Sequence, residues 1–324
     1  MTYSKKLVMA SAMVALAAGC GDDGGNATDA GGESIDAAGP DAGFNEAACP
    51  TAYGPTAVGS TFSVSPAGEG FDLNGDTTID NNIGGQNGLR VLINQSFTGS
   101  LADGSLRTLT ELRDFTAVGT DDSSVTVVLY GGIDSDDPAV LENDFDGDED
   151  YYFDRRWVEP ETCAPVASVP GSYAGGVVTG AADAIQFYIA SLGGFVDFRK
   201  AKLSATIEAA TKGVKTVDGM TARFGGAVPS CSLHKAPSST DFNASALEDV
   251  VRLGGLQPDI DLDGDGLETI LAEAGDGIIS CTDGDGTVIE GADCGCDPRI
   301  ADGFSIAFDI TLVGAGILGP APAE

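Results

Sequence analysis

The sequence predicts a mainly β protein, a β-sandwich or jelly roll with a few short helices. Segments in which apolar and polar residues alternate recur along the chain, and turn-forming Gly, Asn, Asp and Pro separate them. The clearest segment is Phe304–Leu312, where every second residue is large and apolar. This alternation is typical of a strand with one buried face. Many such strands and few helices favour two packed sheets.

Four other segments predict strands. Ser124–Tyr130 is β-branched and apolar on both faces, as expected for a central strand. Alternation predicts strands at Ile185–Ala190 and Leu203–Ala209, and Met220–Val228 predicts another that ends before Pro229.

Three segments predict helices. Leu89–Leu101 has mixed apolar spacing and predicts a short helix. Ser245–Leu253 begins with a capping box and is followed by two glycines, which predicts a second helix. Leu267–Ala274 places its apolar residues on one helical face. Because Phe304–Leu312 follows these segments, residues 245–303 are expected to form a helix-loop-helix insertion before the last strand.

The first twenty residues predict export. Lys5 and Lys6 precede an uncharged run, and small residues stand before Cys20, so residues 1–19 have the features of a signal peptide. The end of this segment resembles the lipobox of bacterial lipoproteins. The resemblance implies cleavage before Cys20 and a thiol carrying two acyl chains such as palmitate, with the new amino terminus usually acylated too. The alternative is an ordinary cleaved signal.

Residues 20–48 are expected to form the lipidated cysteine and a disordered acidic tether, and residues 49–324 the β domain. After Cys20, no stretch has the roughly eighteen apolar residues that a membrane-spanning helix needs, so the expected attachment is lipid alone. In the lipoprotein family, an Asp directly after the lipidated cysteine retains a protein at the inner membrane. Gly21 stands there and favours the outer membrane.

The charge of the chain excludes some partners. Removing residues 1–19 takes away two lysines and no acids, which leaves 14 basic against 50 acidic residues, a formal charge of −36. Such a surface repels nucleic acid and anionic membranes. Hydrophobic residues make up 42% of the chain, so it is not a disordered polyanion. The expected partner is an unidentified protein or glycan, and the expected state is a monomer.

The cysteine count agrees with export. If Cys20 carries lipid, an even number of cysteines remains, and an even number in an exported protein predicts disulfides. Their pairing is open from the sequence, and a zinc site at the Cys-Gly-Cys sequence is disfavoured by its spacing. The six cysteines are Cys49, Cys163, Cys231, Cys281, Cys294 and Cys296.

Acidic residues at alternate positions, with glycine among them, recur in four segments. Ca²⁺ takes six to eight oxygen ligands, and side chains at positions 1, 3 and 5 of a tight loop point toward one ion. Without a cation, carboxylates this close repel one another. The spacing predicts calcium sites, and the alternative for each segment is a solvated turn. The residues are Asp72, Asn74, Asp76 and Asp80; Asp144, Asp146, Asp148 and Asp150; Asp259, Asp261, Asp263, Asp265 and Glu268; and Asp283, Asp285, Glu290 and Asp293.

These loops resemble those of EF-hands, dockerins and thrombospondin type 3 repeats. The match to positions 1, 3, 5 and 6 of an EF-hand loop is best at Asp259, Asp261, Asp263 and Gly264. Position 12 is glutamate in that family and Ile270 here, so Glu268 or Asp265 takes its place. The resemblance implies a static structural calcium site rather than a sensor.

Signatures of enzymes are sparse. His234 is the only histidine, and its Ser/Pro-rich surroundings predict an exposed loop. The Trp157 segment, with Arg155 and Arg156, is either a ligand-contacting patch or, as favoured, a set of internal partners for Asp144–Asp154. The sequence therefore predicts a non-catalytic cell-envelope module for adhesion, surface structure or ligand binding. The alternative is a hydrolase of the glycosidase type that uses two carboxylates.

Overall fold

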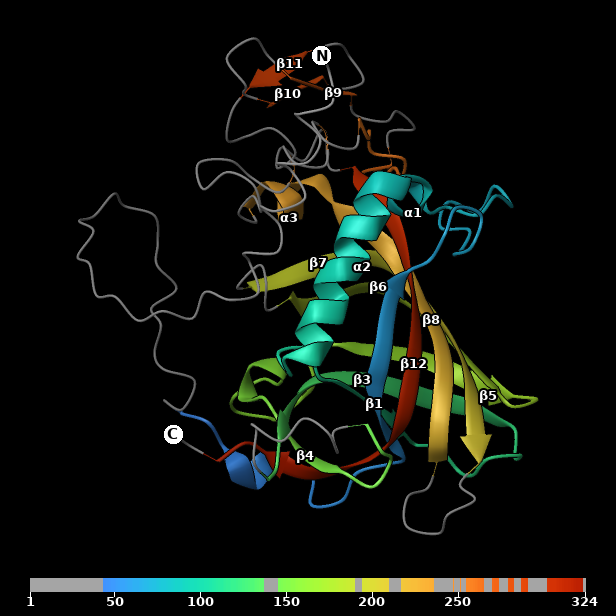
Figure 1. The fold of residues 1–324 in the computed structure, drawn as a ribbon, viewed down its shortest axis with the longest axis vertical. Helices are drawn as coiled ribbons and strands as arrows, with labels where there is room; N and C mark the ends of the chain where they lie inside the picture. The colour runs from blue at the N-terminus through green and yellow to red at the C-terminus, as the bar shows by residue number, and fades with distance from the viewer. Residues whose placement is uncertain are drawn as a thin grey trace, which may run out of the picture.

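The fold is an eight-stranded antiparallel β-barrel with a helix packed beside it (Figure 1). The computed structural model describes residues 43–136, 145–189, 194–209, 217–235, 247, 251, 255–264, 270–273, 279–282, 287–290 and 302–322. In order around the barrel, the strands are β1 (Thr56–Val64), β2 (Thr108–Arg113), β3 (Asp122–Asp134), β5 (Ser168–Ala174), β6 (Val177–Ile189), β7 (Gly194–Ala209), β8 (Val217–Pro229) and β12 (Gly303–Pro320).

The prediction of a mainly β protein is confirmed, but the sheet closes on itself instead of forming a sandwich or jelly roll. β1 pairs with both β2 and β12, and β3 pairs with β5, so each of these eight strands has two neighbours. Strands such as β7 and β12 are long enough to twist around a common interior, and closure removes the unpaired edges of an open sheet. The alternation in the sequence is the same for a barrel and a sandwich.

The five predicted strands lie within β3, β6, β7, β8 and β12. In β12, the alternate residues Phe308, Ile310 and Leu312 point into the barrel, as the pattern at Phe304–Leu312 predicts. β1, β2 and β5 were not predicted, because Gly, Ser, Thr and Pro interrupt the apolar residues of these strands. The short β4 (Asp150–Phe153), also not predicted, pairs with both β3 and β12 at one end of the barrel.

The helix predicted at Leu89–Leu101 is confirmed as α2 (Asn87–Ala102), which follows the single turn α1 (Asn82–Gly85). α2 lies beside β1 (Figure 1), and the Asn94 side chain accepts a hydrogen bond from the Val64 amide at 2.7 Å. The short helices η3 (Glu46–Ala48), η4 (Arg155–Trp157) and α3 (Ser230–Lys235) complete the set described. His234 lies in α3 and is partly buried, so the exposed loop expected for it is wrong.

The insertion before β12 differs from the predicted helix-loop-helix. The helix predicted over Leu267–Ala274 is wrong from Ile270 onward, where strand β9 (Ile270–Glu273) pairs with β10 (Ile279–Thr282). β11 (Val288–Glu290) completes a three-stranded sheet. A short apolar run is compatible with a helix or with a strand, and here the pairing with β10 favours the strand. Of the helix predicted at Ser245–Leu253, Leu247 and Val251 are helical and buried, and the remainder lies outside the described residues.

Residues 1–42, which hold the predicted signal peptide, Cys20 and most of the tether, lie outside the described residues. The last part of the expected tether contacts the domain, because the Asn45 amide donates to the Pro160 carbonyl at 2.8 Å. In the described parts of the chain, no helix combines the length and hydrophobicity required to cross a membrane.

Candidate ligand-binding cavity

The interior of the barrel contains a cavity of about 60 Å³. A single water needs roughly 10–15 Å³ of such volume, so the cavity has room for about four to six waters. Its walls come from α2 and from seven strands of the barrel, namely β1, β2, β3, β6, β7, β8 and β12. The cavity thus lies inside the barrel, is partly open to solvent near the exposed Ser96 and Ser105, and is lined by residues that are far apart in the sequence.

Six phenylalanines form the largest part of the lining. Phe97 of α2 packs edge-on against Phe62 and Phe308, with ring centroids 5.7 and 5.9 Å apart. Phe224 stacks on Phe308 at 6.4 Å, and Phe198 packs against Phe224 at 5.4 Å. Aromatic side chains supply large apolar area with few rotatable bonds. The six rings, which create a rigid apolar surface, are Phe62, Phe97, Phe187, Phe198, Phe224 and Phe308.

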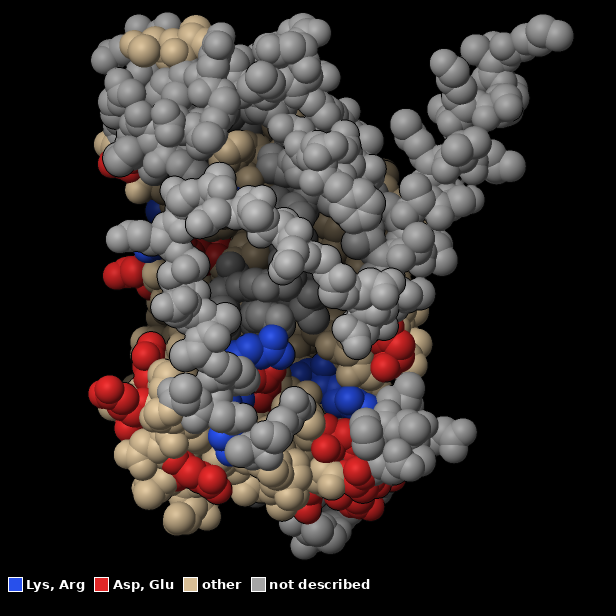
Figure 2. All heavy atoms as spheres, turned by 90° about the vertical axis from the view of Figure 1, so that its left-hand side faces the viewer, with Lys and Arg blue, Asp and Glu red and all other residues tan. Residues whose placement is uncertain are grey.

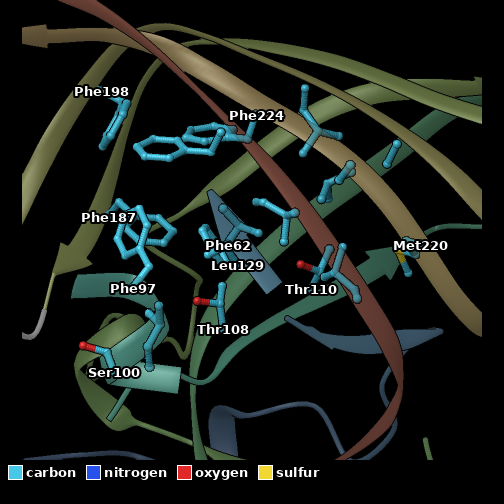
Figure 3. A pocket seen from close by; sticks show the side chains of 18 of the residues that line it. Phe62, Phe97, Ser100, Thr108, Thr110, Leu129, Phe187, Phe198, Met220 and Phe224 are labelled. Carbon is cyan, nitrogen blue, oxygen red and sulfur yellow. The ribbon is translucent and has the colours of Figure 1, made fainter. Parts of the chain in front are cut away.

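Hydroxyl groups form a smaller part of the lining. They come from Ser96 and Ser100 on α2, and from Ser105, Thr108 and Thr110 on and before β2. Figure 3 shows Ser100, Thr108 and Thr110 on the side of the cavity opposite Phe198 and Phe224. Among the residues of the described chain that line the cavity, none is ionisable. The described lining is therefore mainly apolar and carries no charge, and its hydroxyls come from α2, β2 and the residues before β2.

The alternation of β2 places Thr108, Thr110 and Leu112 in the cavity and turns Glu111 and Arg113 to the outer wall. There Glu111 is 2% exposed and accepts from the Gly54 amide and from Arg113 Nε, both at 2.9 Å.

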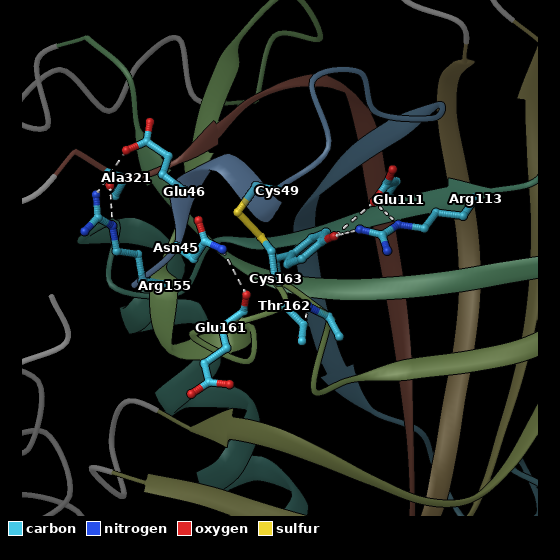
Figure 4. Close-up of a disulfide and its surroundings, with 12 residues drawn as sticks. Asn45, Glu46, Cys49, Glu111, Arg113, Arg155, Glu161, Thr162, Cys163 and Ala321 are labelled. Carbon is cyan, nitrogen blue, oxygen red and sulfur yellow. Dashed lines mark hydrogen bonds and ion pairs between the residues drawn. A yellow bond between two sulfur atoms is a disulfide. The ribbon is translucent and has the colours of Figure 1, made fainter. Parts of the chain in front are cut away.

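Tyr130 completes this network by donating to Glu111 at 3.1 Å, and Arg113 also donates to the Tyr130 oxygen (Figure 4). Burial, reinforced by the Glu111 charge, raises the pKa of Tyr130. The residue therefore remains a neutral donor. The buried Glu111 is satisfied by fixed partners on the outer wall and takes no part in the cavity.

The predicted disulfides are confirmed for Cys49 and Cys163, whose sulfurs are 2.06 Å apart (Figure 4). This bond holds the chain before β1 against the loop after η4, on the outer wall beside the Glu111 network. Cys231 is disulfide-bonded as well. The side chain of Cys281, and the whole of Cys294 and Cys296, lie outside the described residues.

The pairing that the sequence favoured for the Trp157 segment is confirmed for Arg156 and Asp154, whereas Arg155 pairs with Glu46 at 3.9 Å. Arg156 forms an ion pair with Asp154, and the Arg155 guanidinium lies 4.7 Å from the centre of the Phe44 ring. Trp157 is buried at 3% exposure and packs edge-on against the cavity residue Phe187 at 5.3 Å. A side chain on Gly131 would collide with the Trp157 indole, so this packing requires glycine there. Trp157 therefore supports one of the rings that line the cavity.

The predicted calcium loop at Asp259–Glu268 is brought together in part. Carboxylate oxygens of Asp261, Asp263 and Asp302 lie within 4.8 Å of one another, an arrangement that can hold a metal ion. Asp302 was not predicted, because it lies about forty residues away in sequence and joins the loop through the pairing of Ile260 with Gly303.

Asp259 has another role in this structure. It accepts hydrogen bonds from the Ser305 amide at 2.8 Å and from the Ser305 hydroxyl, and burial raises its pKa. Asp265 and Glu268 lie outside the described residues. Of the predicted ligands in this loop, Asp261 and Asp263 thus lie close together, whereas Asp259 bonds to Ser305.

In the loop at Asp72–Asp80, the predicted ligands bond to the loop's own backbone. Asp72 accepts from the Gly75 and Thr77 amides, and Asp80 accepts from the Leu73 amide at 2.6 Å. Asn74 and Asp76 accept from the amides two residues ahead of them. These bonds fix the turn, and calcium binding here stays a prediction.

The two other acidic segments are described only in part. Asp146 accepts from the Asp148 amide at 2.9 Å, whereas Asp144 lies outside the described residues. The neighbouring Glu149 instead groups with Asp134 and Asp136, an acidic cluster that was not predicted. In the last segment, Asp283, Asp285, Asp293 and the side chain of Glu290 lie outside the description.

The acidity of the chain is visible on its surface. Figure 2 shows acidic side chains gathered on the lower part of one face, with a few basic side chains near its middle. The chain matches no protein-family model, and no curated protein or solved structure shows significant similarity to it.

Proposed function

We propose that this protein is a non-catalytic ligand-binding module of the bacterial cell envelope, which holds a small apolar molecule inside its barrel. The observation that carries the proposal is the cavity of about 60 Å³ lined by six phenylalanines. Binding sites for small molecules are concave, mostly apolar and supplied with a few polar groups. The cavity has each of these properties.

The lining favours binding over hydrolysis. A hydrolase of the glycosidase type needs two carboxylates facing one another across the substrate. Around the cavity, the described lining consists of apolar and hydroxyl side chains. Glu111, the buried acid of β2, faces the outer wall and is held by Arg113 and Tyr130. The function proposed for the cavity is therefore capture of a ligand.

The proposed setting is an envelope protein anchored at the outer membrane through lipid on Cys20, with the acidic tether between lipid and barrel. The Cys49–Cys163 disulfide supports an oxidising compartment outside the cytoplasm. Structural Ca²⁺ at Asp261, Asp263 and Asp302 belongs to the same proposal. It is supported by the loop spacing and by the three gathered carboxylates.

The test is binding of toluene, a small neutral ring that matches the apolar, uncharged chemistry of the described lining. Purified protein is titrated with toluene, and the resonances of isotopically labelled methyl groups are followed by NMR. We expect saturable shifts in Leu129, Ala222 and Met220, whose side chains line the cavity. Absence of saturable binding would contradict the proposal.

A matched pair of variants locates the binding. Ala222→Leu adds three carbons to the cavity lining and is expected to abolish toluene binding. Thr221→Leu adds apolar bulk at the next position of β8, on the exposed outer face, and is expected to leave binding unchanged. Circular dichroism checks that both variants are folded. Equal binding by both variants would place toluene outside the barrel.

A further inference from the structure

We propose that the cavity selects a neutral ligand that carries one hydroxyl or carbonyl group, in preference to a hydrocarbon or a carboxylate. This inference rests on the proposed function and names the chemical class of its ligand. Three features of the cavity carry it, namely the state of its threonines, the absence of charge and the position of its hydroxyls opposite two of the phenyl rings.

The first feature is a pair of threonines, Thr108 and Thr110, whose hydroxyls make no hydrogen bond to the described residues and are not fully buried. Thr108 and Thr110 are 4% and 7% exposed, and both line the cavity. Neither hydroxyl makes a hydrogen bond to any other residue that the structure describes. A ligand that enters the cavity displaces water from these hydroxyls, so a ligand that supplies a hydrogen-bond partner in place of that water gains affinity over one that does not. A hydroxyl or carbonyl on the ligand is such a partner, whereas a hydrocarbon is not.

The second feature is the lack of charge. The described lining contains no Lys, Arg or His to pair with an anionic ligand. The arginines on either side of Thr108 and Thr110 along the chain are engaged elsewhere, because Arg113 pairs with Glu111 at 2.9 Å and Arg107 with the buried Asp134 at 3.4 Å. A carboxylate in this cavity would be desolvated without a counter-charge, and the net charge of −34 also repels it. The ligand is therefore neutral.

The third feature is the position of the hydroxyls opposite two of the phenyl rings. Thr108 and Thr110 on β2 and Ser100 on α2 lie on one side of the cavity, and Phe198 and Phe224 lie opposite (Figure 3). A ligand with its polar group toward β2 places its apolar part among the rings. Benzyl alcohol is a small molecule of this kind, with a ring at one end and a hydroxyl at the other.

The experiment compares three ligands of one size, namely benzyl alcohol, toluene and benzoate at pH 7. Affinities for the purified protein come from the NMR titration described above. We expect benzyl alcohol to bind about three- to tenfold more tightly than toluene, the contribution of one or two hydrogen bonds, and benzoate to bind most weakly. Equal affinity for toluene and benzyl alcohol, or tighter binding of benzoate, would overturn the proposal and leave the proposed function standing.

Threonine variants identify the partner. Thr108→Val with Thr110→Val keeps the shape of both side chains and removes both hydroxyls. We expect this double variant to bind benzyl alcohol no more tightly than toluene, with toluene affinity unchanged or improved. The control is Thr221→Val on the exposed face of β8, which should keep the preference of the unmodified protein. A preference that persists in the double variant refutes the role of the threonines, and failure of all three ligands to bind refutes the proposed function itself.

Discussion

The two faces of strand β2 are both buried, yet their polar groups differ in hydrogen bonding. The outer face holds a fully bonded charge, and the inner face carries hydroxyls that make no hydrogen bond to the described residues. On the outer wall, Glu111 has partners on three sides, and the tyrosine and arginine that hold it are themselves packed. In the lumen, the adjacent Thr110 is almost as buried and makes no hydrogen bond to the described residues. The outer wall therefore contributes to stability, whereas the lumen keeps space and hydroxyl groups that can bond to a ligand.

The covering of the two faces explains this contrast. The outer wall is covered by the chain before β1, which the Cys49–Cys163 disulfide fixes in place, and by Phe153 stacked on Tyr130 at 4.9 Å. The partners of Glu111 are thus held rigidly, which lets a charge remain buried. The lumen is filled by phenyl rings, which pack against one another and leave a cavity. A buried charge is therefore tolerated on the outer wall, where its partners are fixed, and the polar groups that line the open cavity are neutral hydroxyls.

The largest expected effect comes from removing the outer network. Glu111→Ala leaves Arg113 and Tyr130 without their buried acceptor and the Gly54 amide without a partner. Breaking a buried ion pair from one side typically costs about 3–5 kcal/mol. The Arg113 side chain is 25% exposed and water compensates part of the loss, so the free energy of unfolding should fall by an amount near or below the low end of this range. Urea denaturation followed by tryptophan fluorescence measures it, since Trp157 is the single tryptophan.

Glu208→Ala is the control for this experiment. Glu208 lies on the exposed surface of β7, and its removal should change the free energy of unfolding by less than about 0.5 kcal/mol. A loss in Glu111→Ala as small as in the control would mean that the outer wall does not depend on its buried charge.

Calcium is expected to have an intermediate effect on the free energy of unfolding. At Asp261, Asp263 and Asp302 the cation would neutralise grouped carboxylates, as Arg113 neutralises Glu111 on the outer wall. Extracellular calcium modules have dissociation constants on the order of 10⁻⁴ to 10⁻³ M. At a concentration ten times the dissociation constant, a single site stabilises the folded state by about 1.4 kcal/mol. The melting temperature should therefore rise in millimolar Ca²⁺ and fall again with chelator.

Asp263→Ala tests whether this loop is the origin of the calcium effect. The variant should lose a large part of the stabilisation by Ca²⁺, whereas Asp183→Ala, an exposed acid on β6, should retain it. If Ca²⁺ does not change the melting temperature of the unmodified protein, a structural calcium site is excluded, including the predicted sites outside the described residues.

The sequence predicts the parts of this fold that depend on local pattern. Alternation locates β12 and the other long strands, and the spacing around Leu89–Leu101 locates α2. Closure of the barrel depends on pairing between β1 and β12, about 250 residues apart, which no local pattern encodes.

The cavity was not predicted for the same reason. Phe62 and Phe308 belong to different ends of the chain, and only closure brings their rings within 6.4 Å. The acidic loop was visible in the sequence, but its third carboxylate, Asp302, is supplied by the approach to β12. The pattern in the sequence that does point to the cavity is the recurrence of phenylalanine at inward positions of several strands.

The smallest expected effect, and the sharpest contrast with Glu111→Ala, comes from Thr110→Val on the neighbouring position of β2. Valine matches threonine in shape, and the hydroxyl it removes makes no hydrogen bond to the described residues. The free energy of unfolding should therefore stay within about 0.5 kcal/mol of the unmodified value or rise slightly. The same urea denaturation measures it. A loss above about 1 kcal/mol would mean that the hydroxyl already has a stabilising partner, and the lumen would then resemble the outer wall. An unchanged stability together with weaker binding of benzyl alcohol would establish that the polar groups of the lumen serve the ligand and not the fold.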